Sequence, residues 1–225
     1  MQAVNIENKG LVKMGKELFE VMTEEEDYGE DFKQEEMAKG TCKICLTRES
    51  EKKKDWMVSP CLCSGSCASV HLSCLKRWVQ YKSIVHEGST TLSYKVDSLT
   101  CEICQACLPH SITYKGQTER LRPQVHDGEC GHPHVTLRNE QTGVYHSICM
   151  EGDGPVSIGR STTNHLLMDE MSISRKHASL STHQGRVMIS DNGSKFGTFV
   201  LLDYLRDCES VKLMSGKWTF GFSIE

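Results

Sequence analysis

Cysteines dominate the chemistry available to this 225-residue chain, which holds twelve of them. Between residues 42 and 104 they fall into closely spaced pairs, and a histidine takes the place of one cysteine in the third pair. Zinc prefers four tetrahedral nitrogen and sulfur ligands, and a two-residue gap lets both ligands of a tight turn reach one ion. Eight ligands predict two closed structural zinc sites, with no position left for a catalytic water. The predicted ligands are Cys42, Cys45, Cys61, Cys63, His71, Cys74, Cys101 and Cys104.

A short helix should carry the third pair of ligands. His71 and Cys74 lie three residues apart, a spacing that places both side chains on one face of a helix. Leu75, Trp78 and Val79 continue the same segment as an apolar stripe. The sequence therefore predicts a helix that begins near His71.

Other cysteines and histidines could compete for metal. Cys67 and Cys107 lie close to the predicted ligands, and we expect both to be bystanders. A later group lacks a second regular pair, so a linker with incidental histidines is favoured over a third metal site. That group consists of His126, Cys130, His132 and His134.

A second set of residues could bind phosphate. From His134 onward, short apolar and β-branched runs alternate with Gly, Asn and Asp, which predicts an all-β antiparallel sandwich. An arginine, a hydroxyl and further basic groups in polar loops are the donors that a phosphate dianion needs. The loops of this region supply Arg160, Ser174, Arg175 and Lys195.

The composition favours two small domains over one large core, because hydrophobic residues make up 38% of the chain and aromatic residues 7%. The N-terminus lacks the pattern of a signal peptide, and no apolar run approaches the ~18 residues that a membrane span needs. We therefore expect a soluble protein with reduced thiols, in the cytoplasm or the nucleus. The net charge of −4 argues against a general nucleic-acid binder.

These patterns divide the chain into an acidic N-terminal tail, a zinc finger, a linker and a sandwich, over residues 1–40, 41–109, 110–132 and 133–225. The tail holds 11 acidic and 5 basic residues. Residues 83–93 should form a surface loop inserted into the finger, since they are rich in Gly, Ser and Thr. Apolar residues at helical spacing predict a short amphipathic helix in the tail, through Leu11, Met14, Leu18, Phe19 and Met22.

The order of four cysteines, one histidine and three cysteines closely resembles the RING-CH (RING-variant) zinc finger. The matching segments are Pro60–Ser66, Val70–His71 and Cys74–Val79. The resemblance implies an α+β finger with interleaved ligands, in which the first and third pairs hold one Zn²⁺ and the second and fourth pairs hold the other. RING-type fingers are ubiquitin ligases that dock a ubiquitin-conjugating enzyme and order its thioester-linked ubiquitin for attack by a lysine. Their contribution is positioning, without a covalent intermediate.

The same resemblance suggests a docking surface for the conjugating enzyme. It comprises Ile44, Trp78 and the turn near Cys101, although Ile44 and Trp78 could serve in packing alone. RING ligases often carry a basic residue just after the last ligand, and this chain has Gln105 there. That departure predicts weaker activity or a dependence on other contacts.

The loops of the sandwich resemble those of the forkhead-associated (FHA) domain, a β-sandwich that binds phosphothreonine peptides. The motifs that carry the resemblance are Gly159-Arg160, Ser174–His177 and Asp191–Val200. It implies phosphate contacts from Arg160 and Ser174, with Arg175 and Lys195 nearby on the binding face. Structural roles fall to His177, as a buried scaffold residue, and to Gly159 and Gly197.

One position departs from the FHA pattern. The family usually has an asparagine before the last glycine, where it grips the peptide backbone, and Phe196 takes its place here. The phosphate contacts remain, but peptide affinity or sequence preference should differ from that of the family.

Together these patterns predict an FHA sandwich that selects a threonine-phosphorylated partner and a RING-CH finger that promotes its ubiquitination. The alternative is a non-catalytic phosphopeptide-binding scaffold, with a PHD-like or inactive RING finger. A PHD finger shares the ligand order but usually separates its second cysteine pair more widely. It also places an aromatic residue where this chain has Leu99.

Overall fold

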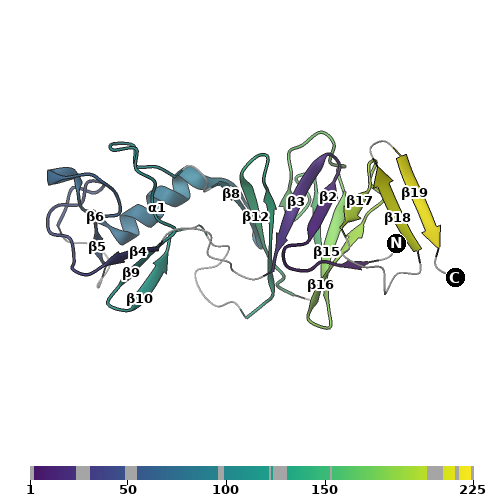
Figure 1. Ribbon diagram of the computed structural model, residues 1–225, viewed down its shortest axis with the longest axis horizontal. Helices are drawn as coiled ribbons and strands as arrows, with labels where there is room; N and C mark the ends of the chain where they lie inside the picture. The colour runs from purple at the N-terminus through teal and green to yellow at the C-terminus, as the bar shows by residue number, and fades with distance from the viewer. Residues whose placement is uncertain are drawn as a thin grey trace.

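The computed structural model describes residues 3–23, 31–48, 55–95, 99–121, 123, 131–152, 154–201, 210–215 and 218–223. Figure 1 shows two lobes side by side along the long axis of the molecule. One lobe contains the helix and the zinc-ligand segments, and we call it the finger lobe. The other contains two large β-sheets, and we call it the sandwich lobe.

The finger lobe is built around one helix with short strands beside it. Strand β6 leads into helix α1 without a break and pairs antiparallel with β5. A second, three-stranded sheet has the order β10-β9-β4. The elements are β4 (Asp31–Gln34), β5 (Met57–Val58), the 3-10 turn η1 (Gly65–Cys67), β6 (Val70–His71), α1 (Leu72–Ser83), β9 (Ser111–Tyr114) and β10 (Gln117–Arg120).

Helix α1 confirms the helix predicted from the apolar stripe. Its inner face buries Leu75 and Val79 against Val58 and Val70, and Trp78 packs at the margin of the same cluster. Two zinc ligands, Cys42 and Cys101, belong to this cluster as well. The apolar core of the finger is therefore small and merges with the metal-binding groups.

The segment predicted as a linker, residues 110–132, is only partly a linker. Its first half forms the hairpin β9–β10, and Ile112 and Leu121 are buried in the finger core. The prediction was wrong for this half because alternating apolar residues pair there with β4 from the predicted tail. Residues 124–130, with His126 and Cys130, lie outside the described residues.

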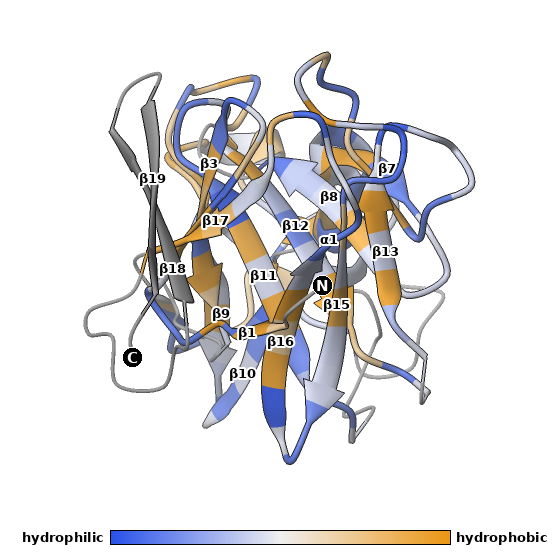
Figure 2. Cartoon of the chain, turned by 90° about the vertical axis from the view of Figure 1, so that its right-hand side faces the viewer, coloured by the Kyte–Doolittle hydropathy of each residue, from blue (hydrophilic) through white to orange (hydrophobic). Residues whose placement is uncertain are grey.

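The sandwich lobe consists of two sheets packed face to face. The seven-stranded sheet has the order β17-β2-β3-β11-β12-β8-β7, and the five-stranded sheet has the order β1-β16-β15-β13-β14. Figure 2 shows apolar residues gathered along β11, β13 and β16, while the loops are largely hydrophilic. The core between the sheets includes Leu137, Ile148, Ile158, Leu180 and Ile189, all of them buried.

Strands of the sandwich come from three separate parts of the chain. The N-terminal region supplies β1 (Val4–Asn5), β2 (Leu11–Met14) and β3 (Glu17–Met22). The segment between Cys74 and Cys101 supplies β7 (Ile84–Glu87) and β8 (Thr91–Lys95). The rest are β11 (His134–Asn139), β12 (Val144–Cys149), β13 (Val156–Gly159), β14 (Leu166–Leu167), β15 (Ala178–His183), β16 (Arg186–Asp191) and β17 (Thr198–Val200). A separate hairpin comprises β18 (Ser210–Ser215) and β19 (Trp218–Ser223).

The helix predicted in the N-terminal tail is wrong. Residues 11–22 form the hairpin β2–β3, which pairs with β17 on one side and β11 on the other. Val12, Met14, Phe19 and Val21 are buried, whereas Leu18 is 41% exposed. Their alternation matches a strand period, and the turn at Gly15 separates the two strands. The sandwich thus includes strands that lie outside the predicted range of residues 133–225. Residues 24–30 of the acidic tail lie outside the described residues.

The surface loop predicted over residues 83–93 is also a hairpin. Strand β8 pairs antiparallel with β12, and Thr91, Leu92, Ser93 and Tyr94 are buried. The Gly, Ser and Thr residues that suggested a loop lie partly in the turn and partly at buried strand positions. The finger therefore donates two strands to the sandwich.

The hairpin β7–β8 connects the two lobes. Helix α1 ends at Ser83 and β7 begins at Ile84, so the helix leads directly into the sandwich sheet. At the same junction the rings of Tyr94 and Tyr145 stack with centroids 5.5 Å apart. Leu99 packs both against this junction and against the finger core.

Candidate zinc centres and phosphate-binding loops

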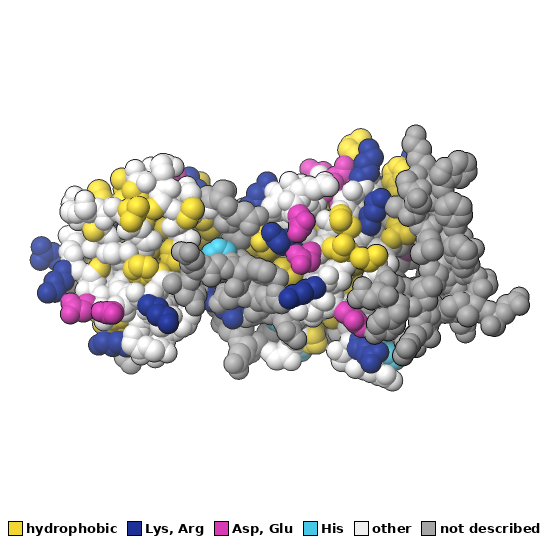
Figure 3. Space-filling view, viewed as in Figure 1, with side chains coloured by type: hydrophobic (Ala, Val, Ile, Leu, Met, Phe, Trp, Pro, Cys, Tyr) yellow, Lys and Arg dark blue, Asp and Glu magenta, His cyan; other side chains and the backbone are white. Residues whose placement is uncertain are grey.

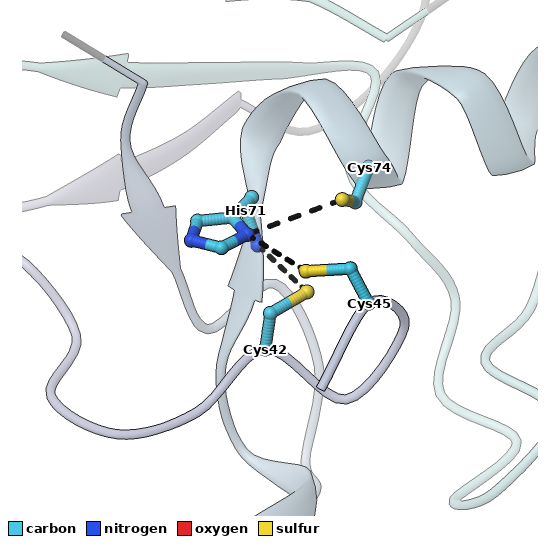
Figure 4. A group of neighbouring side chains, drawn as sticks. All are labelled: Cys42, Cys45, His71 and Cys74. Atoms are coloured by element: carbon cyan, nitrogen blue, oxygen red, sulfur yellow. Dashed lines mark hydrogen bonds between the residues drawn. The ribbon is translucent and has the colours of Figure 1, made fainter. Parts of the chain in front are cut away.

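The first group of metal-binding side chains joins the first and third ligand pairs. Cys42 and Cys45 approach from a turn, while His71 and Cys74 come from the end of β6 and the first turn of α1 (Figure 4). Their ligand atoms lie within 4.8 Å of one another, and the Cys45 sulfur is 3.3 Å from Nδ1 of His71. A set of three thiolates and an imidazole is a common structural zinc site.

The second group joins the second and fourth pairs. Cys61, Cys63, Cys101 and Cys104 place their sulfurs within 4.8 Å of one another, with 3.6 Å between the sulfurs of Cys63 and Cys101. The two groups thus alternate along the chain, as the resemblance implied. Neither group includes Cys67 or Cys107, and no third group of this kind occurs within the described ranges.

The thiols in each group differ strongly in pKa. A hydrogen bond with the Thr47 hydroxyl lowers the pKa of Cys45 to about 6. At Cys101, burial opposes ionisation, but the backbone N–H groups of Cys104 and Ile103 lower the pKa to about 6. Burial, together with neighbouring sulfurs, raises the pKa of Cys63 and of Cys74 to about 12. Close thiolates cannot all ionise without a cation, so each cluster fits a divalent ion such as zinc.

A backbone carbonyl orients the single histidine ligand. Nδ1 of His71 faces the cysteine sulfurs, while Nε2 lies 3.4 Å from the carbonyl oxygen of Arg48. When Nε2–H donates to that carbonyl, Nδ1 keeps its lone pair for metal.

Lys43 links the two clusters, and sequence reasoning missed it. It lies between ligands of the first cluster, yet its ammonium group is 3.4 Å from the sulfur of Cys61 and 3.6 Å from that of Cys101. Burial opposes its charge, but hydrogen bonding and attraction to the sulfurs raise the pKa of Lys43. Four thiolates around one Zn²⁺ carry a net negative charge, which this ammonium group offsets. Nothing in the spacing shows that a residue in one turn would face the other cluster.

The loops predicted to bind phosphate meet around one buried histidine. His177 is fully buried, and its Nδ1 accepts a hydrogen bond from the Ser174 backbone N–H at 3.0 Å. Nε2 must then carry the hydrogen, and it donates to the carbonyl of Gly197 at 3.1 Å. The histidine therefore joins the loop before β15 to the loop before β17.

Two glycines lie where these loops leave little room. A Cβ atom on Gly159 would lie 2.5 Å from the carbonyl oxygen of Arg175, so the close approach of the two loops requires glycine. Gly197 has a φ of 78°, a left-handed conformation that side chains disfavour.

The loops enclose an open hollow of about 770 Å³. The Ser174 hydroxyl oxygen accepts a hydrogen bond from the Lys195 backbone N–H at 2.9 Å, which leaves its own hydrogen to donate. The cationic side chains of the hollow are exposed, and the structure brings all four predicted phosphate-binding residues to it. They are Arg160, Ser174, Arg175 and Lys195, joined by Lys176. Exposed Met171 and Phe196 add apolar surface to the same hollow.

Asp191 shapes the loop that carries Lys195, a role the sequence analysis did not assign. One of its carboxylate oxygens accepts hydrogen bonds from the N–H groups of Gly193 and Ser194, at 2.9 and 3.1 Å. The other accepts from the hydroxyl of Thr198 at 2.9 Å. Burial works against its charge, but these hydrogen bonds hold the pKa of Asp191 below its usual range. An Asp two residues before Gly is a signal for such a turn.

The fold and both sites define a chain with two parts, a zinc finger with interleaved ligands and a β-sandwich with a cationic hollow at its loops. Comparison with known families agrees: residues 42–104 match the RING-variant domain, and residues 156–217 match the FHA domain. The chain therefore contains a RING-variant zinc finger followed by an FHA domain.

The chain is also similar to the E3 ubiquitin-protein ligase MARCHF7 of Rattus norvegicus, Mus musculus and Pongo abelii. Each is 29% identical over 100 residues, which is 44% of this chain. The match covers 12% of the rat and mouse proteins and 11% of the Pongo abelii protein, so the chain spans only a small part of their length. No solved structure matches the chain.

Replacing Lys43 by Met should weaken zinc binding at the second cluster. We expect about tenfold faster loss of one of two zinc ions to a chelator, since partners of metal ligands typically contribute tenfold or more. Colorimetric zinc release would measure it, with Lys43→Arg as a charge-preserving variant and Lys39→Met at an exposed position as control. Equal release rates for all variants would show that Lys43 does not support the cluster.

Replacing Asp191 by Asn should destabilise the protein by about 1 kcal/mol at pH 7, because hydrogen bonds to a charged acceptor are lost. A carboxylate whose pKa is lowered by folding stabilises the folded state above about pH 4, and this contribution disappears as the pH falls through its folded pKa. The difference from wild type in urea unfolding should therefore shrink as the pH falls below 4. Asp169→Asn, at an exposed position, is the matched control. A difference that is independent of pH would contradict this role.

Proposed function

We propose that this chain is an E3 ubiquitin ligase that recruits phosphothreonine-containing partners through its FHA domain. The observation that carries the proposal is the RING-variant match over two complete groups of zinc ligands. That match favours the ligase type of finger over the PHD-like alternative. The similar MARCHF7 proteins are themselves named E3 ubiquitin-protein ligases.

An exposed apolar surface on the finger supports docking of a ubiquitin-conjugating enzyme. Ile44 is 42% exposed and Ile103 is 60% exposed, and each lies between the two cysteines of its pair. Figure 3 shows hydrophobic side chains at the surface of the finger lobe. Trp78 is half-buried against the finger core, so it would contribute its outer edge. Apolar anchors of this kind dominate many interfaces.

Gln105 stands where RING ligases often place a basic residue. Its side-chain Nε2 donates to the carbonyl oxygen of Glu102 at 3.1 Å, so the amide bonds to its own turn. Contacts with ubiquitin would then depend on other groups of the finger.

The hollow of the sandwich supports binding of a phosphorylated threonine. Arg160 and Lys195 offer positive charge, and the Ser174 hydroxyl offers a donor in the same hollow. Charged donors of this type bind phosphate more strongly than neutral ones. Phe196 cannot replace the amide hydrogen bonds of an asparagine, so recognition of the peptide would rest more on phosphate and apolar contacts.

The connection between the two lobes supports the proposal that the finger and the sandwich act together. Because α1 leads directly into β7, the finger and the sandwich share a continuous element. A target held by the sandwich would stay near the conjugating enzyme held by the finger, which raises its local concentration.

Among the described residues, no helix is long and apolar enough to cross a membrane. None of the ten cysteines within the described ranges forms a disulfide bond. The cytoplasmic or nuclear location inferred from the sequence stays a prediction.

The variant Ile44→Ala should lose ubiquitin-chain formation by about tenfold or more, since removal of an interface anchor often costs that much. The assay measures chain formation with a panel of conjugating enzymes, and Val85→Ala, at an exposed position in β7, is the control. No activity of the wild type with any enzyme would favour the inactive-finger scaffold instead.

The variant Arg160→Ala should weaken binding of a phosphothreonine peptide by about tenfold or more, because charge-assisted hydrogen bonds contribute about 1.5–3 kcal/mol. Fluorescence titration against phosphothreonine, phosphoserine and unphosphorylated peptides measures this, with Arg186→Ala as control at an exposed site on β16. Equal binding of all peptides, unaffected by Arg160→Ala, would contradict the reader function.

A further inference from the structure

The seven-stranded sheet contains one position that is filled by a separate hairpin. Strand β2 pairs with β17 in the register Val12↔Val200, and β3 pairs with β11 in the register Val21↔Leu137. The hairpin β2–β3 thus fills a gap two strands wide between β17 and β11. We call this gap the hairpin position.

The C-terminal hairpin β18–β19 pairs its strands in the same register as the hairpin β2–β3. In the sequence, a Gly-Lys pair separates the two strands of each hairpin: Gly15-Lys16 in the first and Gly216-Lys217 in the second. Adding 201 to each residue number converts one register into the other: Val12↔Phe19 becomes Leu213↔Phe220. Val21, which is buried in the core, corresponds to Phe222.

The turn at Gly15 and Lys16 lies closely against Ser172. Gly15 has a φ of 63°, and a Cβ atom there would lie 2.5 Å from the hydroxyl oxygen of Ser172. The next residue, Lys16, donates its backbone N–H to the same hydroxyl at 2.9 Å. A hairpin that enters this position therefore needs glycine first in its turn, and the sequence has Gly216 at the corresponding position between β18 and β19.

The family comparison points to β18 independently. The FHA match runs through residue 217, so it includes β18 together with β17. In this structure, however, the neighbour of β17 is β2, while β18 and β19 form a two-stranded sheet of their own within the described part of the chain. Figure 1 shows that pair beyond β17, at the end of the sandwich lobe.

We propose that the hairpin position binds either hairpin of this chain, and that β18–β19 can enter it in exchange for β2–β3. The exchange releases residues 11–22, whose buried side chains Val12, Met14, Phe19 and Val21 then lose their cover. The finger stays attached to the sandwich through β7 and β8. This inference is independent of the ligase and reader functions.

Three variants of the full chain test the exchange: Phe19→Asp, Phe220→Asp and the double variant. Each single variant should keep a cooperative unfolding transition, since the other hairpin can fill the position. The double variant should lose that transition, because a buried carboxylate disfavours both occupants. Loss of the unfolding transition in Phe19→Asp alone would overturn the proposal. A double variant that unfolds in the same way as Phe19→Asp would also overturn it.

Hydrogen exchange by mass spectrometry shows which hairpin is seated. In Phe19→Asp, amides of residues 210–223 should gain protection and those of residues 11–22 should lose it. Gly15→Val provides a second test, because it disfavours β2–β3 through the turn without adding a charge to the core. No gain of protection at residues 210–223 in either variant would overturn the proposal.

Discussion

In each zinc cluster, four ligand atoms from distant segments of the chain meet within 4.8 Å. The first cluster joins the turn at Cys42 to helix α1, and the second joins the Cys61 segment to the turn at Cys101. Without a cation, close thiols resist ionisation together, as the raised pKa of Cys63 and Cys74 shows. The metal ions therefore supply cohesion that the small apolar core of the finger lacks. They also fix the turns that expose Ile44 and Ile103.

The finger and the sandwich depend on each other through shared strands. Hairpin β7–β8 leaves the finger after α1 and completes one edge of the seven-stranded sheet. The N-terminal strands lie in the sandwich before the chain enters the finger. The finger is thus inserted, in sequence, between strands of the sandwich, and it is not an independent unit at one end of the chain. This connectivity limits how far the cationic hollow of the sandwich and the zinc finger can move apart.

The sequence predicted which residues gather in the two zinc groups and around the hollow of the sandwich, because these patterns depend on residue type and spacing. Ligand pairing followed from the family resemblance, and the structure brings the same eight residues together. The strands of residues 11–22 were missed because Leu11, Met14 and Leu18 also fit a helix period, and only pairing with β17 and β11 selects the strand. Lys43 was missed because its role depends on the approach of two turns that are distant in sequence. Thr91 and Ser93 suggested a loop, yet strand pairing buries them beside β12.

We propose that one chain couples recognition of a phosphorylated target to transfer of ubiquitin. The most direct test of this proposal is the rate of ubiquitin transfer to a lysine-bearing peptide, with and without a phosphothreonine, at concentrations below saturation. We expect faster modification of the phosphorylated peptide, with the advantage abolished by excess free phosphothreonine peptide and self-ubiquitination left unchanged. Equal rates for both peptides, from a chain that is active in self-ubiquitination, would contradict it.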